Sequence, residues 1–304
     1  MIKINVSDEI GQIKTVVLGI ANDFGGVPSF EECYDPKSKE HVLNNTFPDE
    51  KDCILELNEF LDVLLKYEIE VLRPNNITGL NQIFSRDIAF AIEDKLFISN
   101  IIQDRVKEIT AIDHIIKQIT FDDIIRIPKE VRIEGGDVIL HRDHIFIGYS
   151  NIQDFEKYTV ARTNFDAVSF ISSYFPNKKI IGFELVKSDV DARKNALHLD
   201  CCFQPIGKGM AIIYKDGFKN KKDIEFLSNY FGSENLIELT TQEMYDMNSN
   251  IFSISENVIV SEKGFERLNN NLRSNGFVVE EVSFSEISKM EGLLRCATMP
   301  LIRE

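Results

Sequence analysis

The chain has 304 residues, of which 43% are hydrophobic and 27% are charged. These ordinary globular values exclude the disordered, collagen-like and coiled-coil classes. The 34 Lys and Arg residues stand against 49 Asp and Glu residues, and the net charge of −15 opposes binding to nucleic acid or another polyanion.

The N-terminal sequence and the cysteine content bear on the cellular compartment. The first twenty residues contain no apolar signal core followed by a small-residue cleavage site, and no run of 18 uncharged apolar residues occurs in the chain. Five cysteines at irregular spacing suit a reducing compartment better than a disulfide framework. We therefore expect a cytoplasmic protein that does not bind a membrane and has at least one thiol free for chemistry.

The predicted elements form a repeating pattern along the chain. A strand, a helix and a second strand are predicted first, at 15–19, 52–67 and 68–74. Paired apolar runs separated by a few polar residues then predict four β-hairpins, at 88–99, 137–148, 202–214 and 251–262. Helical spacing follows most hairpins, as at 106–116 and 168–175, and later strands are predicted at 178–185, 235–240 and 276–282.

The repeated unit is a hairpin, a helix and a strand, with a period of roughly 50 to 65 residues, which is typical of repeats that close into a ring. The N-terminal strands and helix, completed by the C-terminal segment, supply a further repeat. No linker rich in Pro, Gly or Ser divides the chain. We therefore expect one α/β domain that spans residues 1–304.

Polar residues precede the first strand of each repeat at similar spacing. They are Arg86-Asp87, Glu134 to Asp137, His198 to Asp200, Met247-Asn248 and Arg295-Cys296. If the units surround an axis, equivalent positions converge and bring carboxylates, an imidazole and a thiol into one central cleft.

Most lone cysteines are inert core residues, but the context of Cys296 strengthens the case for a functional thiol at this position. Gly292 and Pro300 make its segment turn-like, whereas Cys201 and Cys202 open an apolar strand and are predicted to be packing residues. His198 precedes a predicted strand and lies two residues before Asp200. In an extended backbone both side chains share a face, although a buried, hydrogen-bonded histidine would give the same pattern.

Two other motifs have simpler explanations. His141 and His144 could begin a zinc site, but no further residues at ligand spacing accompany them, so we predict a solvated hairpin turn and no metal. The paired glycines between Glu134 and Asp137 fit a tight turn as well as a cleft.

Taken together, four motifs resemble the guanidino-group-modifying enzymes. These are N-x-x-F-x-R-D at Asn81, Phe84, Arg86 and Asp87, EGGD at 134–137, HLD at 198–200 and RCATMPLIR at 295–303. Their order and spacing also agree with the family, over nearly the whole chain. The resemblance implies a five-bladed α/β propeller with pseudo-fivefold symmetry and ββαβ-type repeats around a central cleft.

The resemblance also implies roles for the converging residues. Cys296 would be the nucleophile and His198 the general acid and base. Glu134 and Asp137 would orient the histidine and the substrate. Asp87 and Asp200 would hold the guanidinium group, whose planar set of donors suits paired carboxylates.

Further residues would contact the substrate. Arg162-Thr163-Asn164 is similar to the RTN of the deiminase and dimethylarginine hydrolase branches, where the arginine receives the substrate carboxylate. Arg105 is a second candidate for that role. Asn81, Phe84 and Arg295 belong to the same motifs and complete the expected substrate-binding set.

The motif details favour a hydrolase of the arginine deiminase type. HLD, the N-x-x-F-x-R-D run, and an arginine directly before the cysteine all point to arginine or a close relative as substrate, with citrulline and ammonia as products of a covalent thiouronium intermediate. An amidinotransferase and a dimethylarginine dimethylaminohydrolase are the alternatives, and a non-catalytic binding propeller is a remote one. We expect a small cationic guanidino substrate and no cofactor, and the sequence leaves a homo-oligomer open.

Overall fold

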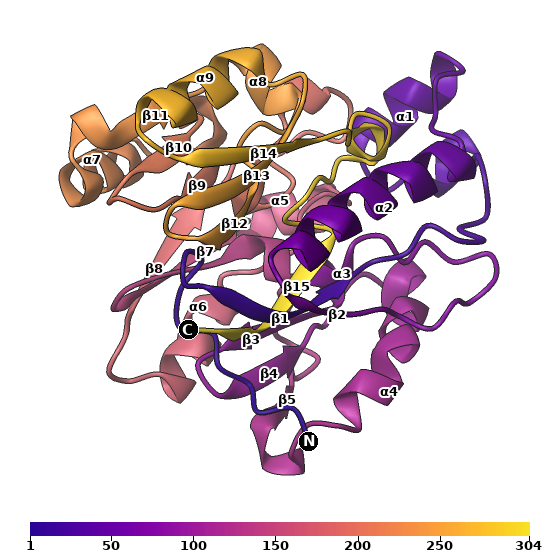
Figure 1. Ribbon diagram of the computed structural model, residues 1–304, viewed down its shortest axis with the longest axis horizontal. Coiled ribbons are helices and arrows are strands. Elements are labelled where there is room, and N and C mark those ends of the chain that lie inside the picture. Colours follow the sequence, from indigo (N-terminus) through magenta and orange to yellow (C-terminus); the bar gives the residue numbers. More distant parts are fainter.

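The computed structural model describes residues 1–304 and shows five three-stranded sheets surrounded by short helices (Figure 1). In every sheet the middle strand pairs antiparallel with one neighbour and parallel with the other. This is the hairpin followed by a parallel strand that the sequence predicts for each repeat.

The first sheet joins the two ends of the chain. Strand β1 (Ile13–Leu18) pairs antiparallel with β15 (Thr298–Arg303) and parallel with β2 (Glu70–Leu72). Helices α1 (Pro36–Leu43) and α2 (Glu50–Lys66) connect β1 to β2. The predicted completion of an N-terminal repeat by the C-terminal segment is therefore confirmed.

The second and third sheets contain two of the predicted hairpins. The second consists of β3 (Ala89–Ile92), β4 (Lys95–Ile98) and β5 (Ile124–Arg126), with helices α3 (Ser85–Ile88) and α4 (Asp113–Ile116). The third consists of β6 (Val138–His141), β7 (His144–Tyr149) and β8 (Lys179–Glu184), with helices α5 (Ile152–Lys157) and α6 (Asp166–Tyr174).

The fourth and fifth sheets repeat the arrangement. The fourth consists of β9 (Phe203–Pro205), β10 (Ala211–Ile213) and β11 (Leu236–Glu238), with helix α7 (Lys221–Phe231). The fifth consists of β12 (Phe252–Ser255), β13 (Val258–Glu262) and β14 (Val278–Val282), with helices α8 (Thr241–Tyr245) and α9 (Glu266–Ser274).

Short 3₁₀ turns connect many of these elements. Three of them lie at the candidate site or lead into it: η2 (Gln103–Ile112), η4 (Gly135–Asp137) and η6 (Leu199–Cys201). The others are η1 (Phe30–Glu32), η3 (Phe121–Asp123), η5 (Ala192–Lys194), η7 (Lys215–Gly217), η8 (Ser233–Asn235) and η9 (Ile287–Met290).

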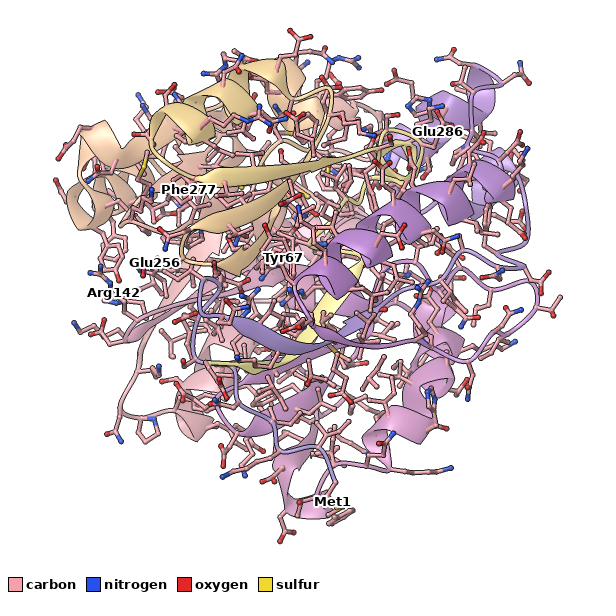
Figure 2. The ribbon with its side chains drawn as sticks, viewed as in Figure 1. Met1, Tyr67, Arg142, Glu256, Phe277 and Glu286 are labelled. Atoms are coloured by element: carbon pink, nitrogen blue, oxygen red, sulfur yellow. The ribbon has the colours of Figure 1, made fainter.

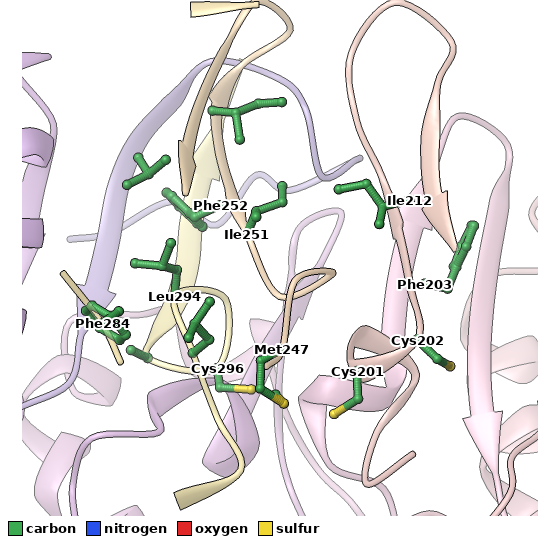
Figure 3. Packing of buried hydrophobic residues seen from close by; sticks show 14 of the residues in the cluster. Cys201, Cys202, Phe203, Ile212, Met247, Ile251, Phe252, Phe284, Leu294 and Cys296 are labelled. Atoms are coloured by element: carbon green, nitrogen blue, oxygen red, sulfur yellow. The ribbon is translucent and has the colours of Figure 1, made fainter. Parts of the chain in front are cut away.

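Apolar side chains between the sheets and helices form the core (Figure 3). The ring of Phe60 on α2 packs edge-on against Phe252 and Phe284, with both ring centroids 5.8 Å away. Burial of such rings is worth several kcal/mol each, and truncating one to alanine typically costs about 3 to 5 kcal/mol. Cys201 and Cys202 are buried in the same core, which confirms that they are packing residues.

Charged side chains cover the outside of the molecule (Figure 2). Arg142 and Glu256, labelled there, are exposed in the turns of the β6–β7 and β12–β13 hairpins. Arg142 has a φ of 56° and Glu93 in the β3–β4 turn has a φ of 52°, as tight two-residue hairpin loops require. No helix of the chain combines the length and the apolar character needed to cross a bilayer.

Two sequence predictions need correction. The segment 106–116 is mostly a 3₁₀ helix rather than an α-helix, and this conformation aligns side chains three residues apart, such as those of Arg105 and Glu108. His141 and His144 do flank a hairpin turn, but they are buried rather than solvated because both rings pack against Tyr230 of helix α7.

Candidate active site

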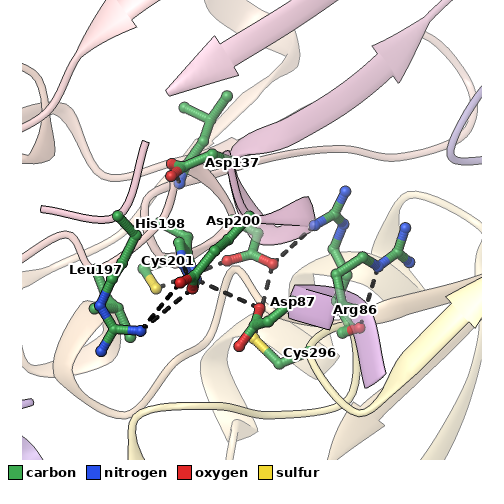
Figure 4. Close-up of polar contacts among 12 residues, drawn as sticks. Arg86, Asp87, Asp137, Leu197, His198, Asp200, Cys201 and Cys296 are labelled. Atoms are coloured by element: carbon green, nitrogen blue, oxygen red, sulfur yellow. Dashed lines mark hydrogen bonds and ion pairs between the residues drawn. The ribbon is translucent and has the colours of Figure 1, made fainter. Parts of the chain in front are cut away.

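Residues of the segments that precede the first strands come together in polar contacts, as Figure 4 shows. Several of them line one cavity of about 310 Å³. Seven of the predicted site residues line it: Asn81, Phe84, Asp87, Arg105, Arg162, His198 and Cys296. The remaining four, Glu134, Asp137, Asp200 and Arg295, do not line the cavity but are buried and linked to the lining residues. The predicted convergence of thiol, imidazole and carboxylates is therefore found in the structure.

Direct contacts join motifs that lie far apart in the sequence. The backbone N–H of Arg86 donates to the carbonyl oxygen of Cys296 at 3.0 Å, which links the N-x-x-F-x-R-D run to the last motif. The backbone N–H of Leu199 donates to Asp137 at 2.9 Å and links HLD to EGGD. Because each link joins two sheets, the site depends on closure of the whole fold.

Cys296 lies in an environment that keeps its thiol protonated. Its sulfur lies 3.8 Å from Oδ2 of Asp200, and the side-chain amide of Asn250 donates to the sulfur at 3.1 Å. Burial, followed by the negative charges of Asp200 and Asp87, raises the pKa of the thiol well above its ordinary value, and the Asn250 contact acts in the opposite direction.

His198 is held by a buried carboxylate. Its Nε2 lies 2.9 Å from Oε2 of Glu134, and its Nδ1 lies 3.8 Å from Oδ1 of Asp87. Burial alone would lower the pKa of the imidazole, but the charges of Asp87, Glu134 and Asp137 outweigh burial and raise it to about 9. The histidine is therefore an imidazolium at neutral pH, ready to donate a proton.

The glycines of EGGD permit close approach rather than an unusual turn. A Cβ on Gly136 would lie 2.6 Å from Nδ1 of His198, and one on Gly135 would collide with the carbonyl oxygen of Arg86. Neither glycine has a positive φ. The sequence left a tight turn and a cleft as explanations for Gly135-Gly136. Close packing at the cleft explains the two glycines better than a turn does.

Arg162 and Arg105 bind carboxylates of the protein itself. The Nη1 atom of Arg162 lies 3.3 Å from Oε2 of Glu134, and its other nitrogens donate to backbone carbonyls of Thr159 and Tyr34. Burial would raise the pKa of Glu134, but the guanidinium of Arg162 and the imidazole of His198 hold it well below its usual range.

Arg105 donates to Asp87 at 2.8 Å and, through two nitrogens, to Glu108 at 2.8 and 2.9 Å. Ligand atoms of Asp87, Glu134 and His198 lie within 4.8 Å of one another, close enough to share a cation. Arg105 and Arg162 already pair with Asp87 and Glu134, so these two carboxylates carry little uncompensated negative charge. This favours an organic ligand over a metal ion.

The two aspartates predicted to hold the guanidinium already have partners in the protein. One oxygen of Asp87 accepts from Arg105, and Oδ1 of Asp200 accepts from the thiol of Cys201 at 3.8 Å. Asp200 accepts from Nη1 of Arg295 at 2.8 Å, and Arg295 also pairs with Glu9 at 2.9 Å, so this arginine lies behind Asp200 and away from the cavity. Oδ1 of Asp87 and Nδ1 of His198 are buried and have no hydrogen-bond partner in the protein. Two unpartnered polar atoms at one cavity are typical of a ligand site.

Of the remaining predicted residues, Phe84 and Asn81 line the cavity and Asp137 lies behind it. The ring of Phe84 lies so close to Gly292 that no side chain would fit there. The side chain of Asn81 accepts from the backbone N–H of Ile83 at 3.0 Å and is half-buried. Asp137 contacts the backbone of Leu199 rather than the imidazole of His198, so it positions the HLD segment.

Sequence reasoning missed several residues of the site. Asn250 lies two residues after the Met247-Asn248 pair that was singled out, and only its contact with Cys296 reveals its place. Residues 24–28, residues 32–35 and Glu291 also line the cavity. Two features of the sequence could have indicated these residues. They are the glycine pair Gly25-Gly26 and the position of Glu291, five residues before Cys296.

Comparison with protein families identifies the group to which the chain belongs. A family model described as N,N dimethylarginine dimethylhydrolase, eukaryotic, matches residues 37–303. The chain belongs to this family. It is thus a member of the guanidino-group-modifying superfamily that its motifs resemble. The family model represents the dimethylarginine branch, whereas the motifs favoured the arginine deiminase branch.

Curated relatives include members of both known and unknown activity. An uncharacterized protein, YkgA from Bacillus subtilis, is 29% identical over 273 residues, which cover 86% of this chain and 87% of that protein. An arginine deiminase from Listeria monocytogenes is 23% identical over 289 residues, which cover 82% of this chain and 66% of the deiminase. The chain therefore spans just under two thirds of that deiminase's length.

Solved structures share the fold at low sequence identity. The N-terminal domain of ArgZ, an arginine dihydrolase from cyanobacteria, matches with a TM-score of 0.78 and 16% identity over 96% of this chain and 98% of that one. SxtG, an amidinotransferase from Microseira wollei, matches with a TM-score of 0.77 and 16% identity over 99% and 97% of the two chains. These likenesses confirm the five-bladed α/β propeller fold.

Proposed function

We propose that this protein is a hydrolase that breaks a C–N bond at the guanidino carbon of arginine or a close relative, including methylated arginines. The observation that carries the proposal is the arrangement of a thiol, an imidazole and two carboxylates. Cys296, His198 and Asp87 line one cavity, and Asp200 lies next to the sulfur of Cys296. This set matches the needs of covalent catalysis on a planar cation.

The two aspartates would fix the substrate against the sulfur. A guanidinium group is planar, and its N–H donors point outward in that plane, so carboxylates can bind it along more than one edge. Oδ1 of Asp87 is a buried acceptor that lacks a donor. Asp200 does not line the cavity, but its carboxylate lies 3.8 Å from the sulfur and would supply the second acceptor. Arg105 and Arg295 hold the two carboxylates in place, so little reorganisation is needed when substrate binds.

In the first half-reaction the thiol of Cys296 loses its proton to solvent as the cationic substrate binds, because the substrate offsets the negative charges that disfavour the thiolate. The thiolate attacks the guanidino carbon and forms a C–S bond. His198 donates its proton to the leaving nitrogen, the C–N bond breaks, and an amine or ammonia departs. A covalent thiouronium remains on the sulfur.

In the second half-reaction a water molecule resolves the intermediate. The imidazole of His198, now neutral, takes a proton from the water, and the oxygen forms a bond to the thiouronium carbon. The C–S bond breaks and returns the thiolate, the remaining O–H proton passes to solvent as the carbonyl forms, and His198 regains its positive charge beside Glu134. The product is a ureido compound, which is citrulline when the substrate is arginine.

The relatives support this chemistry without deciding the substrate. Arginine deiminases occur among the curated relatives, and the matched family model is named for dimethylarginine. Both names describe substrates with a guanidino group at the end of an amino-acid side chain. An amidinotransferase would share the first half-reaction and would use an amine in place of water.

Mass spectrometry of the products tests the proposal. Purified protein is incubated with arginine and, separately, with Nω-methylated arginines, each with and without added glycine. We expect citrulline from at least one substrate, released with ammonia or the methylated amine. A new guanidino compound that forms only with glycine would instead identify a transferase, and unchanged substrates would contradict the proposal.

A further inference from the structure

A second pair of carboxyl groups faces the same cavity as Cys296. Asp35 and Glu291 both line the cavity and both are buried, with 7% and 5% of their surface exposed. Oε1 of Glu291 accepts from the side-chain amide of Asn195 at 2.7 Å. Its other oxygen, Oε2, is buried and receives no hydrogen bond. None of the chemistry proposed for Cys296 uses this pair.

The pair lacks a cation of its own. Asp35 is the N-cap of helix α1 and accepts from the backbone N–H of Ser38 at 2.7 Å. Burial, followed by the neighbouring Asp35 carboxyl, raises the pKa of Glu291 well above its usual range. The nearby cation Lys37 acts against this shift, but its Nζ donates to the carbonyl of Tyr245 at 2.6 Å and does not bond to Glu291. Without a ligand, burial and the nearby Asp35 carboxyl therefore favour the protonated form of Glu291.

The charges around the cavity favour a cationic tail on the substrate. Six acidic residues line the cavity and only two arginines do; the acids are Glu32, Asp35, Asp87, Asp104, Glu108 and Glu291. The arginines, Arg105 and Arg162, already pair with Asp87, Glu108 and Glu134. A carboxylate on the substrate would have to compete with these buried partners, whereas an ammonium group would find an acceptor without a donor.

We propose that Asp35 and Glu291 form a subsite for an ammonium group in the tail of the guanidino substrate, and that this contact selects substrates with a second positive charge. The inference rests on the proposed function, because it assigns the tail of the molecule whose guanidinium faces Cys296. An ammonium donates to the free Oε2 of Glu291 and to Asp35, and it replaces the proton that burial favours on Glu291. The expectation that Arg162 or Arg105 receives a substrate carboxylate would then not apply to this chain.

Binding to a catalytically inactive variant tests the subsite. In a Cys296→Ala background, calorimetry compares three ligands with the same guanidino head: butylguanidine, (4-aminobutyl)guanidine and 4-guanidinobutanoate. We expect the amine to bind at least 10-fold more tightly than butylguanidine, and the carboxylate to bind more weakly than either. Glu291→Gln, which keeps the shape and the bond to Asn195, should remove the preference for the amine and leave butylguanidine unchanged.

Matched variants separate the subsite from a structural role. Asp35→Asn retains an N-cap and should also reduce the amine preference. Glu32→Gln removes an exposed charge from the same cavity and should not reduce it. Equal binding of butylguanidine and the amine, or an amine preference that survives both Glu291→Gln and Asp35→Asn, would overturn the inference. Failure of all three guanidines to bind would overturn the proposed function, and the subsite with it.

Discussion

Asn250 contacts Cys296 with both ends of its side-chain amide. Nδ2 donates to the sulfur at 3.1 Å, while Oδ1 accepts from the backbone N–H groups of Cys296 and Arg295 at 3.1 and 3.0 Å. One residue thus fixes the backbone that carries the nucleophile and supplies a donor to the sulfur. This donor is neutral, so it can stabilise a thiolate without repelling a cationic substrate.

Replacing Asn250 should therefore slow the chemistry more than it weakens binding. For Asn250→Ala we expect kcat to fall about 10- to 100-fold, since a hydrogen bond to a charged group is lost, with a smaller change in KM. Steady-state kinetics on the best substrate measure both constants. Asn257→Ala, at an exposed position in the turn of the β12–β13 hairpin, is the matched control. An unchanged kcat for Asn250→Ala would show that the contact with sulfur has no catalytic role.

The aspartates that face the guanidinium should be sensitive to loss of charge. Asp87→Asn and Asp200→Asn each leave a buried cation short of a partner, which costs about 2 to 5 kcal/mol and lowers kcat/KM by about 30-fold or more. Asp104→Asn is the control, because Asp104 lines the same cavity but is exposed, where solvent screens its charge. Similar kinetics for Asp87→Asn and Asp104→Asn would contradict the assigned role of Asp87.

The pH dependence of activity should report the pair His198 and Glu134. The pKa of His198 is raised to about 9, so the general acid is present at neutral pH and is lost as the pH rises through about 9. Glu134→Gln removes a negative charge beside the imidazole and should move this alkaline limb of kcat/KM to lower pH by about one unit or more. Profiles between pH 6 and 10 measure the shift, with exposed Glu130→Gln as control. An alkaline limb at the same pH in Glu134→Gln would mean that another group controls it.

The thiol of Cys296 should become reactive only when a cation occupies the site. Its raised pKa predicts slow alkylation by a neutral reagent at pH 7 in the free protein. Guanidinium chloride, at concentrations far below those that unfold the protein, should accelerate the reaction, whereas tetramethylammonium chloride at equal ionic strength should not. Cys296→Ala identifies the labelled site. Unchanged or slower alkylation with guanidinium, together with thiolate absorbance at pH 6 in the free protein, would indicate a preformed Cys296/His198 ion pair instead.

Much of the fold could be predicted because the repeats have strong local signals. Alternating apolar runs with short polar turns located the hairpins. The similar spacing of these hairpins predicted that the residues before them converge. The 3₁₀ conformation of 103–112 could not be predicted from apolar spacing, because buried polar contacts of Arg105 stabilise it. The burial of His141 was missed for a similar reason, since its partner Tyr230 lies 89 residues away.

The site was predicted where residues open a repeat and was missed elsewhere. Cys296, His198 and the aspartates occupy equivalent positions, so their convergence follows from the symmetry of the fold. Asn250 and Glu291 lie outside this pattern: Asn250 contacts the sulfur of Cys296, and Glu291 lines the cavity. The partners of Arg162 could not be predicted either, because its bond to Glu134 joins the connection between α5 and α6 to the segment that precedes β6.

Trapping the covalent intermediate tests the central claim most directly. The protein is mixed with excess substrate, quenched in acid within the first turnovers, digested and mapped by mass spectrometry. We predict an adduct with the mass of the substrate less the departing amine, on the peptide that contains Cys296, and neither adduct nor turnover in Cys296→Ala. An adduct on one of the other cysteines, or turnover by Cys296→Ala, would contradict the account; those cysteines are Cys33, Cys53, Cys201 and Cys202.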